Sequence, residues 1–566
     1  MPSGFAIQIA SSPHIDAPAL PEYAETRRFR GVSLPPHGWP LALLLILYIV
    51  PGLIGHDPWK VEDATAFGVI FDMLQRGNWL TPSIADQAYP HAPLYYWIAA
   101  ACGKLVSWLL PLPDAVRLSS GIFTFLILGF AHLAARALHG RDYAVAAPLV
   151  LAGSIGFLLH AHQTQPMLIT LAAHFAAYWA LALLERRPRQ AALILGLALG
   201  MGMLGNGLAT MALLLPVALL AFALSSHQQK VGLALLGALI IAGTLLALWL
   251  LPLSLYAPNY LGDWWQLELD QLGSTEHPLN TALSYLAMLP WYAWPAVPLA
   301  GWTLWSKRRL LNTPALALPL CGFFTVLLSL SLLYEARSVP ALLLLPPLVL
   351  LAAPGLSSLR RGAANAMDWF AMMTFTIFAG LIWIGWCAMV FGWPERLARQ
   401  VVRLEPGFVG SFSALPFLLA LLATAAWGWL IVSSPRSPFR GMTHWAAGVT
   451  LFWLLAGALW LPWIEYGKTY RPLSAAMAKA LPDRHGCIAG AGLADAQRAS
   501  FDYFSGIITL PHDSRAARRC DWLLTQGSAR SDDNAPGDNW KRVWQGNRPG
   551  DHKEKFRLYR REAIAP

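Results

Sequence analysis

Charged residues are scarce in this chain. Asp, Glu, Lys and Arg make up 13% of its 566 residues, against 56% hydrophobic residues. Soluble globular proteins contain about 25% charged residues, so the composition excludes an ordinary soluble enzyme. Apolar runs such as 39–55 and 231–255 are long enough to cross a bilayer core of about 30 Å. The sequence therefore predicts a polytopic α-helical membrane protein.

Cysteine is also sparse, and its five residues are too few for a disulfide scaffold. Cys102, Cys321 and Cys387 lie in apolar segments, where a thiol packs as a small hydrophobic side chain. Cys487 and Cys520 are the two cysteines of the polar C-terminal stretch. We expect them to form a disulfide, which requires that this stretch lie in an oxidising compartment. The alternative is two free, buried thiols.

Several recognisable motifs are missing. The sequence contains no zinc signature and no P-loop, and the glycines at 200–202 lie inside an apolar run, where they serve packing. No metal-ligand set and no certain cofactor are expected, although a divalent metal is left open. The N-terminus lacks the pattern of a removable signal peptide, so residues 1–38 are expected to form a mostly disordered cytoplasmic leader.

Lys and Arg gather in short loops, which favours a cytoplasmic location for those loops. The clusters are Arg27/Arg28/Arg30, Arg136/Arg141, Arg186/Arg187/Arg189, Lys230, Lys307/Arg308/Arg309, Arg360/Arg361 and Arg436/Arg440. All of them lie inside only if the segment 92–110, with its aromatic cluster and Lys104, runs along the outer interface without crossing. About thirteen spans then result, with the C-terminal stretch outside. They are 40–55, 117–137, 143–162, 165–184, 190–204, 207–224, 231–256, 283–303, 313–333, 339–356, 369–391, 412–432 and 444–464.

Ionisable residues concentrate on the outer side of this topology, which makes that side the candidate functional face. A loop carboxylate such as Asp57, Asp72 or Asp86 is ordinarily just solvated. Glu62 and Asp63 differ because they open an amphipathic stretch. At that helix N-terminus they either carry chemistry or only cap the helix and compensate its dipole.

A second polar group follows in the outer turn near residue 160. His160 and His162 either take part in a site or are interfacial side chains bonded to the backbone. Their i, i+2 spacing is not that of a helical metal pair.

The first outer loop carries a longer pattern. From Trp59 it reads W-K-V-E-D-A-T-A-F-G-V-I-F-D-M-L-Q-R-G-N-W-L-T-P, followed by Y-P-H-A-P-L-Y-Y-W. This resembles the first periplasmic loop of the GT-C membrane glycosyltransferases related to the lipid A aminoarabinose transferase and the protein mannosyltransferases. The resemblance extends to the basic loop, the second outer turn, Pro290-Trp291 and Pro346-Pro347, and it covers nearly the whole membrane part.

The resemblance implies a glycosyltransferase of GT-C architecture in a bacterial inner membrane. Such an enzyme moves a sugar from a polyprenyl-phosphate carrier to an envelope glycolipid, such as lipid A, at the outer face, with no nucleic-acid partner. The acidic residue of the family's first loop would map onto Glu62, with Asp63 next to it, and the resemblance implies that these two residues are catalytic. Carrier-phosphate or substrate binding would fall to His91, His160, His162, Gln165, His277 and Arg337. We expect the carboxylates to converge with His91, His160, His162 and Arg337 on one outward-facing cavity.

The chain departs from the family pattern at several positions. Pro90-His91 replaces a Glu-Lys pair, Gln165 replaces an acidic residue, His162 replaces an Arg before it, and Asn206 replaces a Lys. A cation near the carrier phosphate stabilises the leaving group, and His91 could do so when protonated, or Arg337 permanently. The second interpretation is a lipid-linked-sugar binder or flippase-like protein on a transferase scaffold that has lost part of its site.

The C-terminal stretch changes character. Residues 465–566 contain 17 Lys or Arg and 12 Asp or Glu, with no long apolar run. Short strands near 487–489 and 522–525 flank a helix near 494–504, and the segment from Phe556 is typical of a basic edge strand. We expect a small periplasmic α/β domain that follows a transmembrane domain at 39–464 with its outer loop and interfacial helix at 56–110. The basic excess favours anionic lipid headgroups or serves solubility alone.

Overall fold

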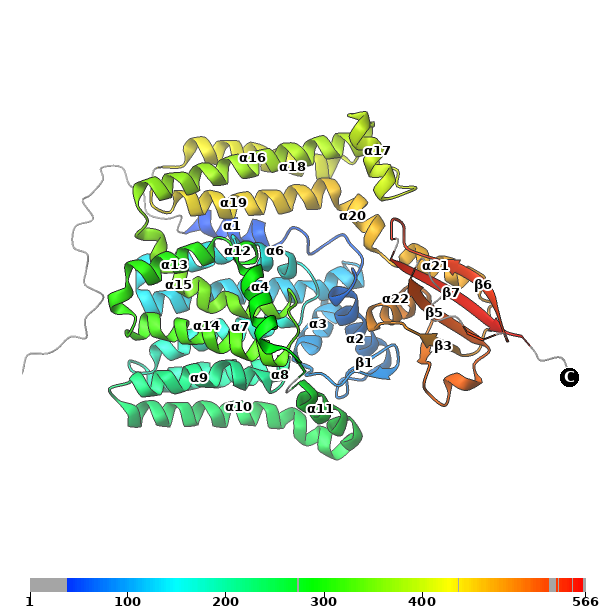
Figure 1. Ribbon diagram of the computed structural model, residues 1–566, viewed down its shortest axis with the longest axis horizontal. Helices are drawn as coiled ribbons and strands as arrows, with labels where there is room; N and C mark the ends of the chain where they lie inside the picture. Colours follow the sequence, from blue (N-terminus) through cyan, green and yellow to red (C-terminus); the bar gives the residue numbers. More distant parts are fainter. Residues whose placement is uncertain are drawn as a thin grey trace, which may run out of the picture.

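The computed structural model describes residues 38–271, 274–435, 437–528, 536–537, 539–551 and 553–562. The predicted leader, apart from residue 38, and Arg436 lie outside the described residues. The described chain has two parts, a bundle of long helices and a smaller part built on a five-stranded sheet (Figure 1).

The long helical part runs from residue 39 to residue 468. Its helices are α1 (Trp39–Ile49), α2 (Glu62–Arg76), α3 (Leu94–Val106), α4 (Leu112–His139), η1 (Arg141–Tyr143), α5 (Ala146–Ala152), α6 (Ile155–Ala161), α7 (Met167–Leu183), α8 (Pro188–Asn206), α9 (Ala209–Leu224), α10 (Gln228–Tyr256), α11 (Pro258–Gln271), α12 (Pro278–Tyr292), α13 (Ala296–Ser306), η2 (Arg308–Leu310), α14 (Pro314–Leu333), η3 (Pro340–Leu344), α15 (Leu345–Ser357), α16 (Arg361–Phe391), α17 (Glu395–Leu404), α18 (Ala414–Ser433), α19 (Arg440–Leu455), η4 (Ala456–Trp460) and α20 (Leu461–Lys468). A short hairpin, β1 (Ser83–Ile84) with β2 (Gln87–Ala88), follows α2.

Many of these helices are apolar over their length. Within the described residues, seven are long and apolar enough to cross a membrane, and the bent pair Arg141–Ala152 and Ile155–Ala161, which meet at 71°, makes an eighth if it is one span. The predicted polytopic helical architecture is therefore confirmed at this level. The number of thirteen crossings stays a prediction.

The segment expected along the interface forms α3. Its 13 residues reach only about 20 Å, too short for a bilayer core. Just beyond its end, Trp108 and Leu109 expose 81% and 66% of their surface, as suits a membrane interface. In Figure 1, α2, α3, α11 and the sheet all lie at one end of the bundle. Segments predicted to lie outside are thus gathered on one side of the molecule.

The C-terminal part is a mixed sheet with helices on one face. Its elements are α21 (Arg471–Ala480), β3 (Ile488–Ala491), α22 (Asp495–Ser505), β4 (Thr509–Pro511), η5 (Ala517–Arg519), β5 (Trp522–Ser528), β6 (Trp540–Gly546) and β7 (Glu554–Arg561). The strand order is β4-β3-β5-β7-β6, with β3 parallel to β4 and β5, and β7 antiparallel to β5 and β6. The prediction that the strand from Phe556 is an edge was wrong, because β6, which the sequence pattern did not reveal, pairs with its other side.

The two faces of this sheet differ. Side chains alternate along each strand, so Ile488 and Leu524 pack on one face with Phe501 of α22. Ala489 and Leu523 pack on the opposite face, together with Ala517 of η5. The helices α21 and α22 therefore cover only one face.

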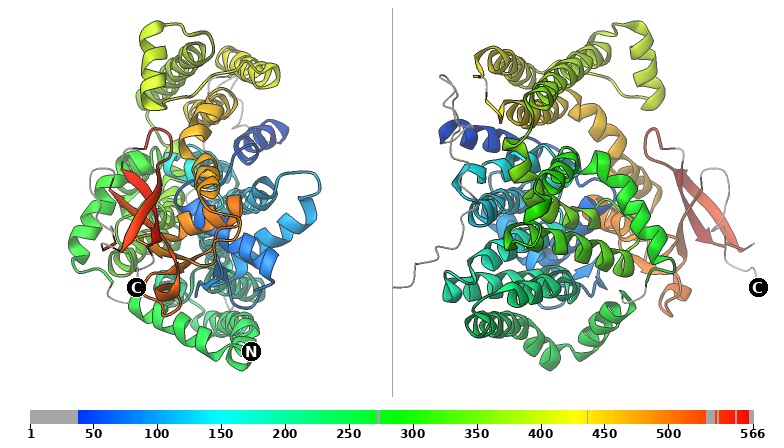
Figure 2. Two further views of the ribbon diagram at one scale, coloured as in Figure 1. Left: turned by 90° about the vertical axis from the view of Figure 1, so that its right-hand side faces the viewer. Right: turned by 60° about the vertical axis from the view of Figure 1, so that its left-hand side comes forward.

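The sheet domain docks onto α2 through α22, and the two views of Figure 2 show it against the same end of the bundle. Phe67 of α2 meets the ring of Tyr503 edge-on at 4.7 Å. A Cβ on Gly68 would lie 2.3 Å from the Cβ of Ala499, so only glycine allows this approach. Arg76 donates to both oxygens of Asp502 at 3.0 and 3.1 Å. The domain therefore braces the helix that begins with Glu62 and does more than confer solubility.

The expected disulfide is present. Cys487 and Cys520 are bonded, with their Cα atoms 5.2 Å apart, and the other three cysteines are free. Cys487 directly precedes β3 and Cys520 lies two residues before β5, and these two strands are paired neighbours. The bond thus links the sheet to the segment that carries η5.

Alkylation of the denatured, unreduced protein is expected to label three thiols, and all five after reduction. The serine variant of either bonded cysteine should destabilise the sheet domain by about 3–4 kcal/mol, because the bond closes a loop of 33 residues. Labelling of all five thiols without reductant would contradict both the bond and an oxidising location.

Candidate active site

Asp63 joins the first outer loop to the second outer turn. It lies in the first turn of α2 and is only 1% exposed. One carboxylate oxygen accepts from the backbone N–H of Trp59 at 2.9 Å, and the other from that of Thr164 at 2.7 Å. The guanidinium of Arg117 lies 3.6 Å away. The capping interpretation therefore describes Asp63 well.

Arg117, on α4, is completely buried and holds the polypeptide around it in place. It donates to Asp114 at 3.0 Å and to the backbone carbonyls of Leu53 at 3.1 Å and His56 at 3.2 Å. A buried cation is tolerated only when it is paired and hydrogen-bonded, and two carboxylates and two carbonyls meet that need here. Arg117 thus fixes the path of the first outer loop relative to α4.

Glu62 is in the opposite situation. Its side chain is exposed, and it accepts no hydrogen bond within the described part of the chain. Nearby protein nevertheless raises the pKa of Glu62 by partial burial, and the charge of Arg337 opposes this rise. The charge of Glu62 in turn contributes to raising the pKa of Tyr89. Glu62 is therefore a free carboxylate whose charge interacts with Tyr89 and Arg337.

Arg337 lies on the outer turn between α14 and η3. The turn is held by α12, where Tyr285 donates to the carbonyl of Glu335 at 2.9 Å and Tyr292 to that of Ser338 at 2.5 Å. Arg337 itself contacts the Glu335 carboxylate at 2.6 Å, but both side chains are about 70% exposed. An exposed pair of this kind adds little stability, so the guanidinium can turn to an anionic ligand.

His91 cannot supply the positive charge that the sequence suggested. Its ring stacks on Tyr89 with centroids 3.9 Å apart, and its Nδ1 is buried without a partner in the described ranges. Burial lowers the pKa of His91 to about 4, so the ring is neutral at pH 7. The expectation of a protonated His91 beside the carrier phosphate is corrected, and Arg337 is left as the cation.

His162 offers no ring nitrogen to a phosphate. Each nitrogen lies 2.7 Å from a backbone carbonyl oxygen, those of Leu158 and Tyr48, and the residue is only 1% exposed. The phosphate-binding expectation is therefore corrected, and the backbone-bonded alternative describes this residue. His160 is also buried, but its Nδ1 has no partner in the described part of the chain, so it stays a candidate.

Two further predicted positions have different surroundings. The Nε2 of Gln165 donates no hydrogen bond and is buried without a partner among the described residues, as is the hydroxyl of Thr164. Buried polar atoms without partners are rare, so these two are available to water or a ligand beside Asp63. His277 is exposed at the start of α12, and no hydrogen bond or ion pair joins it to these groups in the described chain.

The far end of α2 is also polar. Asp72, expected to be solvated, is fully buried, which corrects that expectation. It accepts hydrogen bonds from Arg76 and from the hydroxyl of Ser83. Buried carboxylates thus fix α2 near both of its ends, Asp63 at the start and Asp72 in the last turns.

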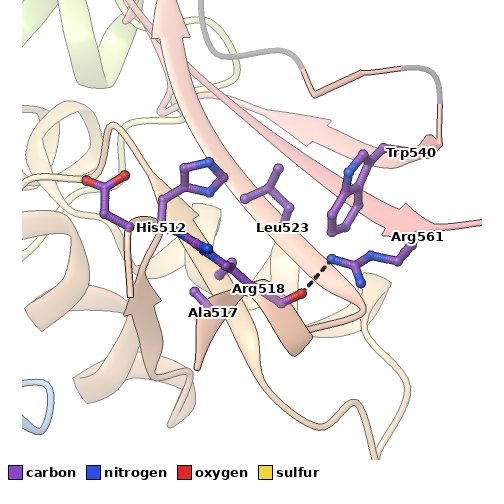
Figure 3. A pocket seen from close by; sticks show the side chains of 8 residues that line it. His512, Ala517, Arg518, Leu523, Trp540 and Arg561 are labelled. Atoms are coloured by element: carbon purple, nitrogen blue, oxygen red, sulfur yellow. Dashed lines mark hydrogen bonds between the residues drawn. The ribbon is translucent and has the colours of Figure 1, made fainter. Parts of the chain in front are cut away.

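A basic hollow of about 320 Å³ lies on the sheet domain (Figure 3). Arg561 donates to the carbonyl of Arg518 at 2.9 Å and lies 4.9 Å from the Trp540 ring. The hollow also includes Ala489 and Leu523, which lie on the sheet face opposite α22, so it is separate from the Glu62 surroundings. Within the described ranges, no group of three or more His, Cys, Asp or Glu residues is arranged to hold a metal ion.

Comparisons with known proteins show what the chain is similar to. The model of the dolichyl-phosphate-mannose-protein mannosyltransferase family matches residues 90–256. An undecaprenyl phosphate-α-4-amino-4-deoxy-L-arabinose arabinosyl transferase of Photorhabdus laumondii is 25% identical over 68% of both chains. The protein of the same name from Pseudomonas aeruginosa is 28% identical over 74% of this chain and 75% of its own length.

The fold also has a solved counterpart. The crystal structure of ArnT from Cupriavidus metallidurans bound to undecaprenyl phosphate superposes with a TM-score of 0.67, at 14% identity, over 92% of this chain and 97% of that one. The predicted resemblance to the GT-C glycosyltransferases is confirmed. The chain is a glycosyltransferase.

The sequence pattern did not reveal the part that Arg117 plays in this glycosyltransferase. Arg117 is the first residue of the predicted span 117–137, and it is fully buried in contact with two carboxylates. The available signal was an arginine three residues after Asp114, at the start of an otherwise apolar run, because such a charge must be paired. Its partner Asp63, across the fold, could not be inferred from spacing.

Replacing Arg117 by Met should destabilise the glycosyltransferase by about 3–5 kcal/mol, because Asp63 and Asp114 would be left buried without their cation. Tryptophan-fluorescence melting in detergent would report the loss. The matched variant Glu62→Gln changes an unpaired side chain and should melt like the wild type. Equal melting temperatures for R117M and the wild type would contradict the stabilising role of Arg117 between Asp63 and Asp114.

Proposed function

We propose that this glycosyltransferase moves a sugar from a polyprenyl-phosphate carrier to an envelope glycolipid at the outer face of a bacterial inner membrane. The observation that carries the proposal is the exposed, unpaired Glu62 in the first turn of α2, on the side of the bundle where the polar loops gather (Figure 1). The names of the relatives favour undecaprenyl phosphate as the carrier and an amino-arabinose as the sugar. The family resemblance favours lipid A as the acceptor.

Glu62 acts as the general base in this proposal. It takes the proton from the attacking oxygen of the acceptor as that oxygen forms a bond to the anomeric carbon of the donor sugar. The bond between this carbon and the carrier phosphate breaks, and the electron pair leaves with the phosphate. A raised pKa suits this role, because it makes the carboxylate a stronger base toward the proton of the acceptor.

Arg337 stabilises the carrier phosphate as its negative charge grows. A guanidinium is permanently charged and can bind two phosphate oxygens at once. Its only carboxylate contact in the described part of the chain is the exposed Glu335, which a doubly charged phosphate can displace. Asn206, which replaces a Lys of the family pattern, leaves Arg337 as the principal cation of this site.

The proposed topology has thirteen crossings, with residues 465–566 in the periplasm and the basic loops in the cytoplasm. Each of the thirteen segments overlaps one helix or two or three successive helices, although 40–55 extends six residues past the end of α1. The disulfide in the sheet domain supports an oxidising location for that domain. The position of α2, α3 and the sheet domain at one end of the bundle (Figure 1) supports a common outer side.

Glu62→Gln should lower the transfer rate by about 10²–10⁴-fold, since the glutamine cannot accept the proton. The measurement is mass spectrometry of lipid A after incubation of the purified protein with undecaprenyl-phosphate amino-arabinose. Glu276→Gln, a matched change at an exposed outer acid, should transfer at the wild-type rate.

Undiminished transfer by Glu62→Gln would overturn the role of Glu62. Absence of transfer by the wild type, with a panel of pentose and hexose donors and envelope acceptors, would overturn the proposed function. Carrier binding without transfer would then favour the lipid-linked-sugar binder.

The pH profile tests the base and the cation together. Transfer should fall as pH falls through the pKa of Glu62, which burial raises, because only the ionised carboxylate accepts a proton. Arg337 lowers that pKa, so Arg337→Ala should move the acid midpoint of kcat/KM to higher pH while also slowing transfer. An acid midpoint of kcat/KM that is unchanged or lower in Arg337→Ala would contradict the interaction between Arg337 and Glu62.

A further inference from the structure

A cleft of about 430 Å³ opens between the first outer loop and the α10–α11 junction. One wall comes from the loop, whose polar members are Asn78, Thr81, Ser83 and Asp86. The other wall runs from residue 256 to residue 260 and contributes Tyr256, Asn259 and Tyr260. The two walls come from segments about 180 residues apart, so the cleft exists only in the folded protein.

The loop wall is held rigidly by donors from three helices. Trp97 of α3 donates to the carbonyl of Trp79 at 2.7 Å, and Trp249 of α10 donates to that of Leu80 at 3.1 Å. Tyr260 of α11 donates to the carbonyl of Pro82 at 3.2 Å. Three successive side-chain donors on one irregular segment predefine the shape of this wall before any ligand binds.

A strained turn presents Asp86 at the cleft. Ala85 and Asp86 form the two-residue turn of the β1–β2 hairpin with φ of 46° and 61°, where glycine or asparagine is usual. The buried Asp72 holds the turn, because it bonds Ser83 and accepts from the backbone N–H of Asp86 at 3.3 Å. Strain that persists because its surroundings enforce it is common at ligand sites. The carboxylate of Asp86 is exposed and accepts no hydrogen bond in the described part of the chain.

The chemistry of the lining suits a saccharide. It offers amides, hydroxyls, one free carboxylate and a tyrosine ring, and none of its residues is Lys, Arg or His. Neutral and acidic groups accept hydrogen bonds from sugar hydroxyls, whereas a phosphate would need cations. The cleft is therefore chemically different from the surroundings of Arg337, where a phosphate can bind.

The cleft is joined to the segment that carries His91. Tyr260 also donates to the carbonyl of Tyr89 at 2.7 Å, and the Tyr89 ring stacks on His91 with centroids 3.9 Å apart. The last turns of α10, which lead to the cleft residue Tyr256, expose a stripe of three leucines at helical spacing. Leu248, Leu251 and Leu255 each leave 63–76% of their surface exposed. A lipid could therefore place its headgroup in the cleft and its acyl chains along this stripe.

We propose that the cleft between the β1–β2 hairpin and the α10–α11 junction binds the saccharide headgroup of the acceptor lipid, with Asp86 and Asn259 bonding its hydroxyls. This inference deepens the proposed function and rests on it, because the bound lipid is an acceptor only if the protein transfers a sugar. The binding of a lipid-borne saccharide itself does not depend on transfer.

Two variants test the cleft without disturbing the fold. Asp86→Asn keeps a residue that tolerates the turn but removes the charge, and Asn259→Trp fills the space from an exposed helix position. Each should raise the KM for lipid A at least about tenfold and leave the KM for the undecaprenyl-phosphate donor within about twofold. Asp270→Asn, an exposed change on α11 outside the cleft, is the matched control and should leave both constants unchanged.

Binding of lipid A in nanodiscs, measured without donor, separates the two proposals. If the wild type binds lipid A and both variants bind it at least about tenfold more weakly, the cleft is supported even when no donor tried supports transfer. Unchanged lipid A binding and KM in both variants would overturn the cleft while leaving transfer intact. Equally tight binding of the deacylated headgroup would overturn the assignment to a lipid and point to a soluble saccharide.

Discussion

The contact between Asp63 and Arg117 is the constraint on which the outer face of this protein depends. Arg117 is fully buried at the start of an apolar helix, so a carboxylate must reach it from elsewhere in the chain. Asp63 reaches Arg117 and also accepts hydrogen bonds from the backbone N–H groups of Trp59 and Thr164. Consecutive helical residues point about 100° apart. With Asp63 turned inward, Glu62 is therefore turned toward a different side, where its side chain is exposed.

The helix α2 passes this constraint on to the rest of the outer face. Its first turn carries the free carboxylate, its middle meets α22 at Gly68, and its end holds Asp72 and Arg76. Asp72 supports the hairpin that borders the saccharide cleft, and Arg76 fastens the sheet domain through Asp502. One fifteen-residue helix thus connects the proposed base, the proposed acceptor site and the C-terminal domain. Loss of the sheet domain would free α2 on one side, which explains why a soluble domain is attached to a membrane enzyme.

Much of the fold could be predicted from the sequence, because apolar run length, basic loops and turn residues act locally. The helical bundle, the short α3 and the disulfide between neighbouring strands all followed from such local signals. The site was harder, because pairing and burial join residues far apart. Nothing near Glu62 and Asp63 in sequence shows which of them Arg117 engages, and neither the buried state of His91 nor the two carbonyls that occupy His162 can be read from spacing. The inner position of β7 was missed for the same reason, since its partner β6 has a weak pattern.

An experimental structure of the protein with undecaprenyl phosphate bound would test the central claim most directly. We predict that the phosphate lies within about 3 Å of the Arg337 guanidinium, that Glu62 faces the adjoining space, and that Asp63 still contacts Arg117 and the backbone N–H of Thr164. A structure in which Asp63 has left Arg117 and faces the phosphate, with Glu62 turned into solvent, would contradict the account.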